Sequence, residues 1–330
     1  VKEKSSARSA HQFNSYAIIF TTMFQQQGFI YRFFLGFAFF LIVQNSTAQF
    51  ALEPSPVYRP DRLKGVVIGE AALAAVASVG LYYLWYKKFP RSRFHFFNDN
   101  KEWLQIDKVG HMTTAYNIAV IQHDLMRWCG VKPNESIIIG AGTALTYMSI
   151  IEVLDGFSTH WGFSKGDMLA NITGTALFAM QQRFWNEQRA TLKFSFHTTP
   201  FAKYNPGELG NNWKSQLLKD YNGQTYWLSF NIKSFLGSNS TVPKWTNVAV
   251  GYGGKGMLAA NDNPKDKNGI ALPEFKRYRQ FYLAPDADFF RIKSNTPLVN
   301  NISYLARFIK VPAPTLELSQ KKLIFHPLYF

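Results

Sequence analysis

Residues 165–197 read KGDMLANITGTALFAMQQRFWNEQRATLKFSFH, and the change of pattern inside this stretch decides the fold. The first part, as far as about Gln188, has the apolar spacing of a packed helix. From Leu192 onwards apolar and polar residues alternate, which is the period of a half-buried strand. Because helical patterns dominate before Arg189 and strand patterns dominate after it, we predict an α+β protein that is divided near this residue.

Three further apolar segments, residues 66–86, 107–128 and 137–154, predict helices on the N-terminal side. With the helix from Lys165 they give a hydrophobic bundle of about four helices over residues 66–189. The segment 66–86 carries the single charge Glu70 and is long enough to cross a bilayer. It therefore predicts either a buried core helix or a membrane span, with the basic residues that follow it on the cytoplasmic side.

Alternating segments separated by Gly, Pro and Asn fill the C-terminal side. We expect an antiparallel β-rich domain over residues 190–330, either a sheet or a partial barrel, and a short helix near 301–309. The aromatic residue Phe330 after an alternating segment is typical of outer-membrane β-structure, whereas Pro327 disfavours a central strand there. The predicted strands are 192–197, 226–232, 245–252, 278–283, 287–292, 316–318 and 323–330.

Residues 29–48, FIYRFFLGFAFFLIVQNSTA, have the pattern of a secretory signal peptide. Arg32 precedes the apolar run 33–43, and small residues lead to a cleavage site before Gln49. A transmembrane anchor is the alternative, but the run is shorter than the roughly 20 residues of a span. We therefore expect a leader over residues 1–48, a Pro-rich linker over 49–65, and export to the cell envelope.

Composition limits the functional classes. The 330 residues carry 36 Lys and Arg against 21 Asp and Glu, a net charge of +15, and 16% of them are aromatic. Such a chain is neither a coiled coil nor a disordered tail. The single cysteine, Cys129, excludes an intramolecular disulfide and a Cys-rich zinc site. Without a long Lys/Arg block or a recognition motif we expect no nucleic-acid partner. The excess of basic residues suits membrane lipid, and an envelope glycan or protein partner is also open.

Polar residues interrupt the predicted helices at three places. Asp107 and His111 lie one turn apart, with Lys108 between them, so the first two share a helix face. Glu152 and Asp155 share a face of the next helix for the same reason. Ionisable groups inside apolar helices are costly unless they are paired or used, so we expect these groups to converge.

The third place is the stretch Trp161–Gly174, where Ser164 can cap a helix whose first turn contains Asp167. Asn171 follows one turn later, and Gly174 allows a neighbouring helix to approach closely. A histidine flanked by carboxylates has the donors and acceptors for general acid–base work. The catalytic hypothesis therefore names His111, Glu152, Asp155 and Asp167, supported by Asp107, Lys108, Ser164 and Asn171.

A structural role is the alternative for the same residues. Lys108 would then pair with a carboxylate, Asp167 would help to cap its own helix, and His111 would donate to Glu152. Because the spacing matches no standard metal box, we predict no metal site, and the sequence leaves any cofactor unknown.

The combination of Asp107-Lys108 with His111, Glu152-x-x-Asp155, and the Trp161–Gly174 stretch resembles the YfiM-like family of uncharacterised bacterial envelope proteins. The resemblance extends to residues 219–229 and to the Phe-terminated end, and so to most of residues 100–330. A fainter similarity links Glu152, Asp167 and Asn171 to the VanZ-like membrane family. The resemblance implies a location in the envelope and implies no reaction.

Taken together, the sequence predicts a membrane-associated envelope protein, structural or accessory, at the outer membrane rather than the inner one. One alternative is a hydrolase or transferase that acts on envelope lipid or glycan through the His/carboxylate cluster. Another is an inner-membrane protein that spans the bilayer through residues 66–86. The sequence leaves enzymatic activity uncertain and favours a non-enzymatic role.

Overall fold

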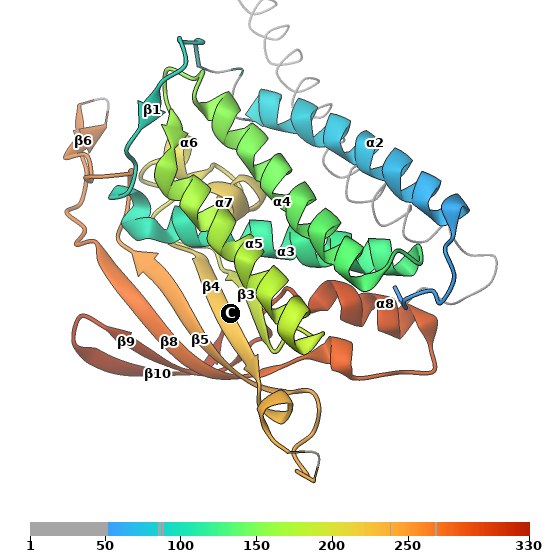
Figure 1. Cartoon of the computed structure of the whole chain (residues 1–330). Coiled ribbons are helices and arrows are strands. Elements are labelled where there is room, and N and C mark those ends of the chain that lie inside the picture. Colours follow the sequence, from blue (N-terminus) through green and yellow to red (C-terminus); the bar gives the residue numbers. More distant parts are fainter. Residues whose placement is uncertain (1–51, 85–86, 88, 238, 268) are drawn as a thin grey trace, which may run out of the picture.

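The computed structural model describes residues 52–330 except 85–86, 88, 238 and 268, so the predicted signal peptide and its cleavage site lie outside the described residues. The described chain is α+β. Helices occupy its N-terminal half, and an antiparallel sheet occupies its C-terminal region, as the patterns predicted (Figure 1).

Four long helices follow the predicted segments: α2 Pro60–Leu84, α3 Ile106–Trp128, α4 Pro133–Asp155 and α5 Lys165–Trp185. Pro133 is the first residue of α4, a position where its missing N–H costs nothing. Asn186 ends α5 in the left-handed conformation, at φ 55°. The helix that was predicted to reach Gln188 is therefore slightly shorter.

Three of the four helices, α3, α4 and α5, pack on one another through a core that contains Tyr116, Ala144 and Phe178. Helix α2 contributes little to this packing. In the most apolar 18-residue stretch of α2, within Pro60–Gly80, only 6% of the residues are buried. By length and composition α2 and α4 are the two described helices that could cross a membrane. Helix α2 contacts the end of α3, where Val66 packs with Met126 and Cys129, and Figure 1 shows α2 on the outside of the helical layer.

Six strands form the main sheet in the order β10-β9-β8-β5-β4-β3, and every neighbouring pair is antiparallel. The strand predicted at 287–292 was wrong beyond Ala287. There Asp288 binds Arg291 three residues later, and this local pair accompanies a 3₁₀ turn, η4. The strands are β3 Ala190–Phe196, β4 Gln224–Asn231, β5 Thr246–Lys255, β8 Tyr278–Ala287, β9 Ala313–Ser319 and β10 Lys322–Tyr329.

Shorter elements complete the described fold. The parallel pair of β1 Phe96–Phe97 and β2 Phe163–Ser164 joins the segments before α3 and α5. The others are η2 Glu102–Gln105, α6 Pro206–Leu209, α7 Trp213–Lys219, η3 Ile232–Phe235, β6 Asp266–Lys267, β7 Ile270–Ala271, η4 Phe289–Arg291 and α8 Pro297–Ala306.

The two ends of the sheet are connected through residues 308–310, which bond to the β3 end and lead into β9 near the other end. The Phe194 N–H of β3 donates to the Phe308 carbonyl at 2.9 Å, and the Lys310 N–H donates to the Phe194 carbonyl at 2.9 Å. The same segment then runs into β9, which pairs with β8 on the other side of the sheet. The outer edge of β3 is therefore covered at its centre, and the inner face of the sheet is enclosed.

The two faces of the sheet differ in chemistry. The outer face carries Leu192 and Leu228, which pack against the helical core. The inner face carries Trp227, Tyr282 and a buried ion pair between Lys193 and Asp286 at 2.6 Å. A small polar and aromatic interior therefore lies on one side of the strands, and apolar side chains lie on the other.

Candidate functional site

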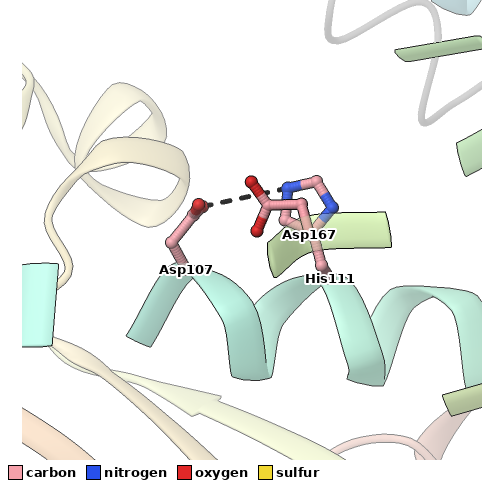
Figure 2. A group of neighbouring side chains, drawn as sticks. All are labelled: Asp107, His111 and Asp167. Atoms are coloured by element: carbon pink, nitrogen blue, oxygen red, sulfur yellow. Dashed lines mark ion pairs between the residues drawn. The ribbon is translucent and has the colours of Figure 1, made fainter. Parts of the chain in front are cut away.

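The site is built around the first turns of α3, where the chain enters the helix from η2. Trp103, Leu104 and Gln105 all have positive φ, and α3 begins at Ile106 directly after them. Asp107 therefore lies in the first helical turn, where the helix dipole favours a negative charge. His111 follows one turn later on the same face, as the spacing predicted, and its Nε2 lies 4.0 Å from Asp107 Oδ1 (Figure 2).

Lys108 connects three carboxylates. Its Nζ lies 2.7 Å from Asp99 Oδ2, 2.8 Å from Asp167 Oδ1 and 3.6 Å from Asp107 Oδ2. Burial alone would lower the pKa of this ammonium group, but the charges of Asp107 and Asp167 outweigh it and raise the pKa to about 12. Lys108 is therefore a fixed internal cation.

Ser164 orders the start of α5, as the capping pattern predicted. Its Oγ accepts the Asp167 N–H at 3.1 Å and donates to Asp99 Oδ1 at 2.6 Å. Its own N–H donates to Glu152 Oε2 at 3.3 Å. One residue thus joins the segment before α3 to α4 and α5, and its hydroxyl is occupied by these contacts.

His111 lies between the acids of two helices. Its Nδ1 is 3.2 Å from Asn171 Oδ1 and 3.4 Å from Glu152 Oε1. Glu152 is almost fully buried, whereas the side chains of His111 and Asp107 keep 17% and 25% of their surface exposed. The network is therefore accessible to solvent at its α3 end and closed at Glu152.

Carboxylates outnumber cations in this network, and their mutual repulsion helps to raise the pKa values of two of the acids. Burial, with help from the charges of Asp167 and Asp155, raises the pKa of Glu152 to about 8. Burial and the charge of Asp107 raise the pKa of Asp167 to about 7. At neutral pH these two acids therefore retain protons for part of the time.

The imidazole responds in the opposite way to its surroundings. Burial would lower the pKa of His111, but the carboxylates of Asp107, Asp167 and Glu152 outweigh it and raise the pKa. His111, whose pKa is raised, therefore lies beside Glu152 and Asp167, whose pKa values are also raised. The arrangement can hold a proton on either His111 or Glu152, whose Nδ1 and Oε1 lie 3.4 Å apart.

The structure brings together seven of the eight residues named from the sequence. The eighth, Asp155, lies at the end of α4 and acts on Glu152 through its charge. Of the contacts expected of a structural network, Lys108 does bind carboxylates. The cap of α5 comes from Ser164, which accepts the Asp167 N–H, while the Asp167 carboxylate binds Lys108. His111 Nδ1 bonds Asn171 Oδ1 and lies 3.4 Å from Glu152 Oε1 without a hydrogen bond between them. The geometry is compatible with either role.

Sequence reasoning missed two members of the network. Asp99 follows β1 in a segment without helical periodicity, so nothing in the sequence indicated its role. Tyr221 donates its hydroxyl proton to Asp107 Oδ1 at 2.7 Å and ties the network to the chain just before β4. It belongs to the stretch 219–229 that contributed to the family resemblance, which was the available signal.

Asp107, His111 and Asp167 place one ligand atom each within 4.8 Å of one another, a spacing that would suit a metal ion. The ammonium group of Lys108 already binds both of these aspartates. A divalent cation would have to displace that charge, so the residues present do not favour a metal here.

Closely packed helices hold this network. A Cβ added to Gly174 of α5 would lie 2.0 Å from the Met112 carbonyl oxygen of α3, so only glycine allows this approach. This is the close contact between helices predicted at Gly174, and it fixes Asn171 one turn earlier against His111.

Comparison with known proteins gives one match. A family described as "Predicted periplasmic lipoprotein (DUF2279)" matches residues 95–183, from just before β1 almost to the end of α5. The match includes all eight residues named from the sequence and leaves the whole six-stranded sheet outside it. No curated protein and no solved structure matches the chain. The match is consistent with an uncharacterised bacterial envelope protein.

Proposed function

We propose that this chain is a membrane-associated envelope protein whose sheet lies against lipid with part of its outer face. The single observation that carries the proposal is the alternation along β8 and β9. On β8, Gln280, Tyr282 and Asp286 are buried, whereas Phe281 and Leu283 are 51% and 47% exposed. A soluble sheet buries its apolar face, and membrane β-structure has the reverse pattern.

The same reversal continues on the neighbouring strand. On β9, Thr315 and Glu317 are buried, and Leu316 and Leu318 are exposed. Each outward residue pairs with an outward residue on the next strand, as Leu283 does with Leu316. The same side of β5 and β10 is also apolar and exposed. We call the exposed apolar residues on this side of β5, β8, β9 and β10 the bare face: Val248, Val250, Phe281, Leu283, Leu316, Leu318, Leu323 and Phe325.

The charged groups behind the bare face contact one another. Asp286 binds Lys193 at 2.6 Å and accepts from Ser229 at 2.6 Å, and Glu317 accepts from Gln280 at 2.7 Å. Oδ1 of Asp286 lies 3.7 Å from Lys310, so this carboxylate has a cation on both of its oxygens. The outer side of the sheet is apolar. The described helices cover it as far as Leu228 on β4, and the bare face remains exposed beyond them.

Helix α2 supports the same proposal, because its apolar surface is almost entirely exposed. We favour the outer membrane, since strands with polar inward and apolar outward residues are typical there. An inner-membrane location with α2 as a span is the alternative. Separation of inner and outer membranes before detection of the chain distinguishes the two.

The proposal is tested by placing charges on the bare face. The double variant Leu283→Lys/Leu318→Lys should lose most of its membrane association in a sucrose flotation assay, because one lysine at the midplane of a bilayer costs about 2–4 kcal/mol. Glu274→Lys, on an exposed loop residue, is the control and should float as the parent chain does. A double variant that folds and still floats fully would refute lipid contact at this face.

A second candidate function, acid–base chemistry on envelope lipid or glycan, is favoured by the raised pKa values of Glu152 and Asp167 beside His111. His111→Asn keeps a polar group near Asn171 but cannot carry a proton at neutral pH. If the site is catalytic, this variant should accumulate normally and fail to complement a strain that lacks the protein. Full complementation would leave only the structural role.

A further inference from the structure

Within the part of the chain that the structure describes, β10 has a free edge. Its strand neighbour there is β9, whereas the other end of the sheet, β3, is covered at its centre by residues 308–310. Leu323, Phe325 and Leu328 on β10 are 60–69% exposed. A long apolar edge strand is a template for pairing with another strand, and an unpaired edge is not tolerated in lipid.

The hairpin geometry determines which backbone groups of β10 are unpaired. Gln320 and Lys321, with φ of 48° and 62°, form a two-residue turn between the paired residues Ser319 and Lys322. In such a hairpin the flanking residues form a hydrogen-bonded pair, and hydrogen-bonded residues then alternate along the strand. Lys322, Ile324 and His326 therefore bond to β9. The backbone groups of Leu323 and Phe325 point to the free edge.

We propose that β10 pairs with the β10 strand of a second copy of this chain, antiparallel and about a twofold axis at Ile324. The inference rests on the proposed lipid contact, because that environment requires the edge to be paired. In this register Leu323 lies opposite Phe325 of the second copy, and every free N–H of the two residues finds a carbonyl. A register that uses Pro327 instead loses a bond, because proline has no N–H.

The side chains agree with this register on both faces. Leu323 and Phe325 continue the bare face, since they pair with Leu318 and Leu316 of β9. On the inner face, Lys322 lies opposite His326 of the second copy. His326 Nε2 is 2.8 Å from Glu317 Oε2, so the lysine of one copy approaches the carboxylate of the other. Opposite charges across such a pair stabilise it, and this complementarity favours a second copy over an unrelated strand.

A cysteine at the twofold axis tests the pairing. Ile324 would face itself in a non-hydrogen-bonded pair, with Cα atoms about 4.5 Å apart, which is within the range of a disulfide. Ile324→Cys in the full chain, oxidised in membranes, should run mostly as a covalent dimer on a non-reducing gel. The parent chain, whose Cys129 is buried, and Val250→Cys, on the central strand β5, should remain monomeric.

A second pair of variants separates pairing from folding. Ile324→Cys/Phe325→Pro removes a free-edge N–H and should lose most of the dimer, whereas Ile324→Cys/Phe325→Ala keeps that N–H and should retain it. Both should give the circular dichroism spectrum of the parent chain, which shows that each is folded. A monomeric Ile324→Cys in the membrane fraction would overturn the pairing and leave the proposed function intact. An adduct with a different protein would also overturn it. A disulfide dimer in the soluble fraction would instead contradict lipid contact.

Discussion

Replacement of Lys108 by methionine is the sharpest test of the buried network. The change keeps most of the side-chain volume and removes the ammonium group that lies 2.7, 2.8 and 3.6 Å from three carboxylates. Removal of one partner from a buried ion pair costs about 3–5 kcal/mol, because the remaining charge is left uncompensated. The lysine keeps 13% of its side chain exposed, and Asp167 can take up a proton. We therefore expect a loss near the lower limit, about 3 kcal/mol.

Guanidinium unfolding of the purified full chain in detergent, followed by tryptophan fluorescence, measures this loss. The double variant Lys108→Met/Asp167→Asn should recover part of it, since the second change removes one uncompensated carboxylate. Lys132→Met is the matched control, because Lys132 forms only an exposed pair with Glu135 at 3.8 Å. A loss below about 1 kcal/mol for Lys108→Met, the value of a surface pair, would show that the three carboxylates do not depend on this ammonium group.

Three further predictions concern the packing and the pH dependence. The pKa of Glu152 is raised to about 8 in the folded chain, so the folded state binds this proton more tightly than the unfolded state does. The free energy of unfolding should therefore fall as pH rises from about 4.5 to 8. Glu152→Gln should flatten that slope in unfolding curves taken across this range. Gly174→Ala should destabilise the chain by about 1–3 kcal/mol, because the added Cβ would meet the Met112 carbonyl oxygen. Gly142 has open space around it, so Gly142→Ala should stabilise α4 by about 0.5–1 kcal/mol. Thermal unfolding of both variants measures the difference. Asp286→Asn should leave two buried lysines without a counter-ion and cost about 3–5 kcal/mol by denaturant unfolding, and a change below about 1 kcal/mol would show that this interior pair is unimportant.

The sequence predicted the long helices and most strands because their apolar periodicity is strong. Helix α3 and strand β4 begin within a few residues of the predicted positions. It also predicted that His111, Glu152 and Asp167 would meet, since isolated ionisable groups in apolar helices are costly. The role of Asp99 was not predicted, because this residue lies in an irregular segment between β1 and η2, where apolar periodicity carries no information.

Sequence alone could not predict which face of the sheet is covered. Alternation along β8 shows that two faces differ, but it does not say which one the chain encloses. That depends on the connection made when residues 308–310 bind β3 and lead into β9, a contact between segments more than a hundred residues apart. The reversed placement of Asp286 and Leu283 became visible only in the structure.

Whether the bare face lies in lipid is measured most directly at Leu283. Leu283→Cys, labelled with an environment-sensitive fluorophore and reconstituted in vesicles, should emit as a probe in hydrocarbon and be quenched by spin-labelled acyl chains. The same label at Glu274→Cys should emit as a probe in water. Water-like, unquenched emission from position 283 in a folded chain would show that the bare face does not lie in lipid.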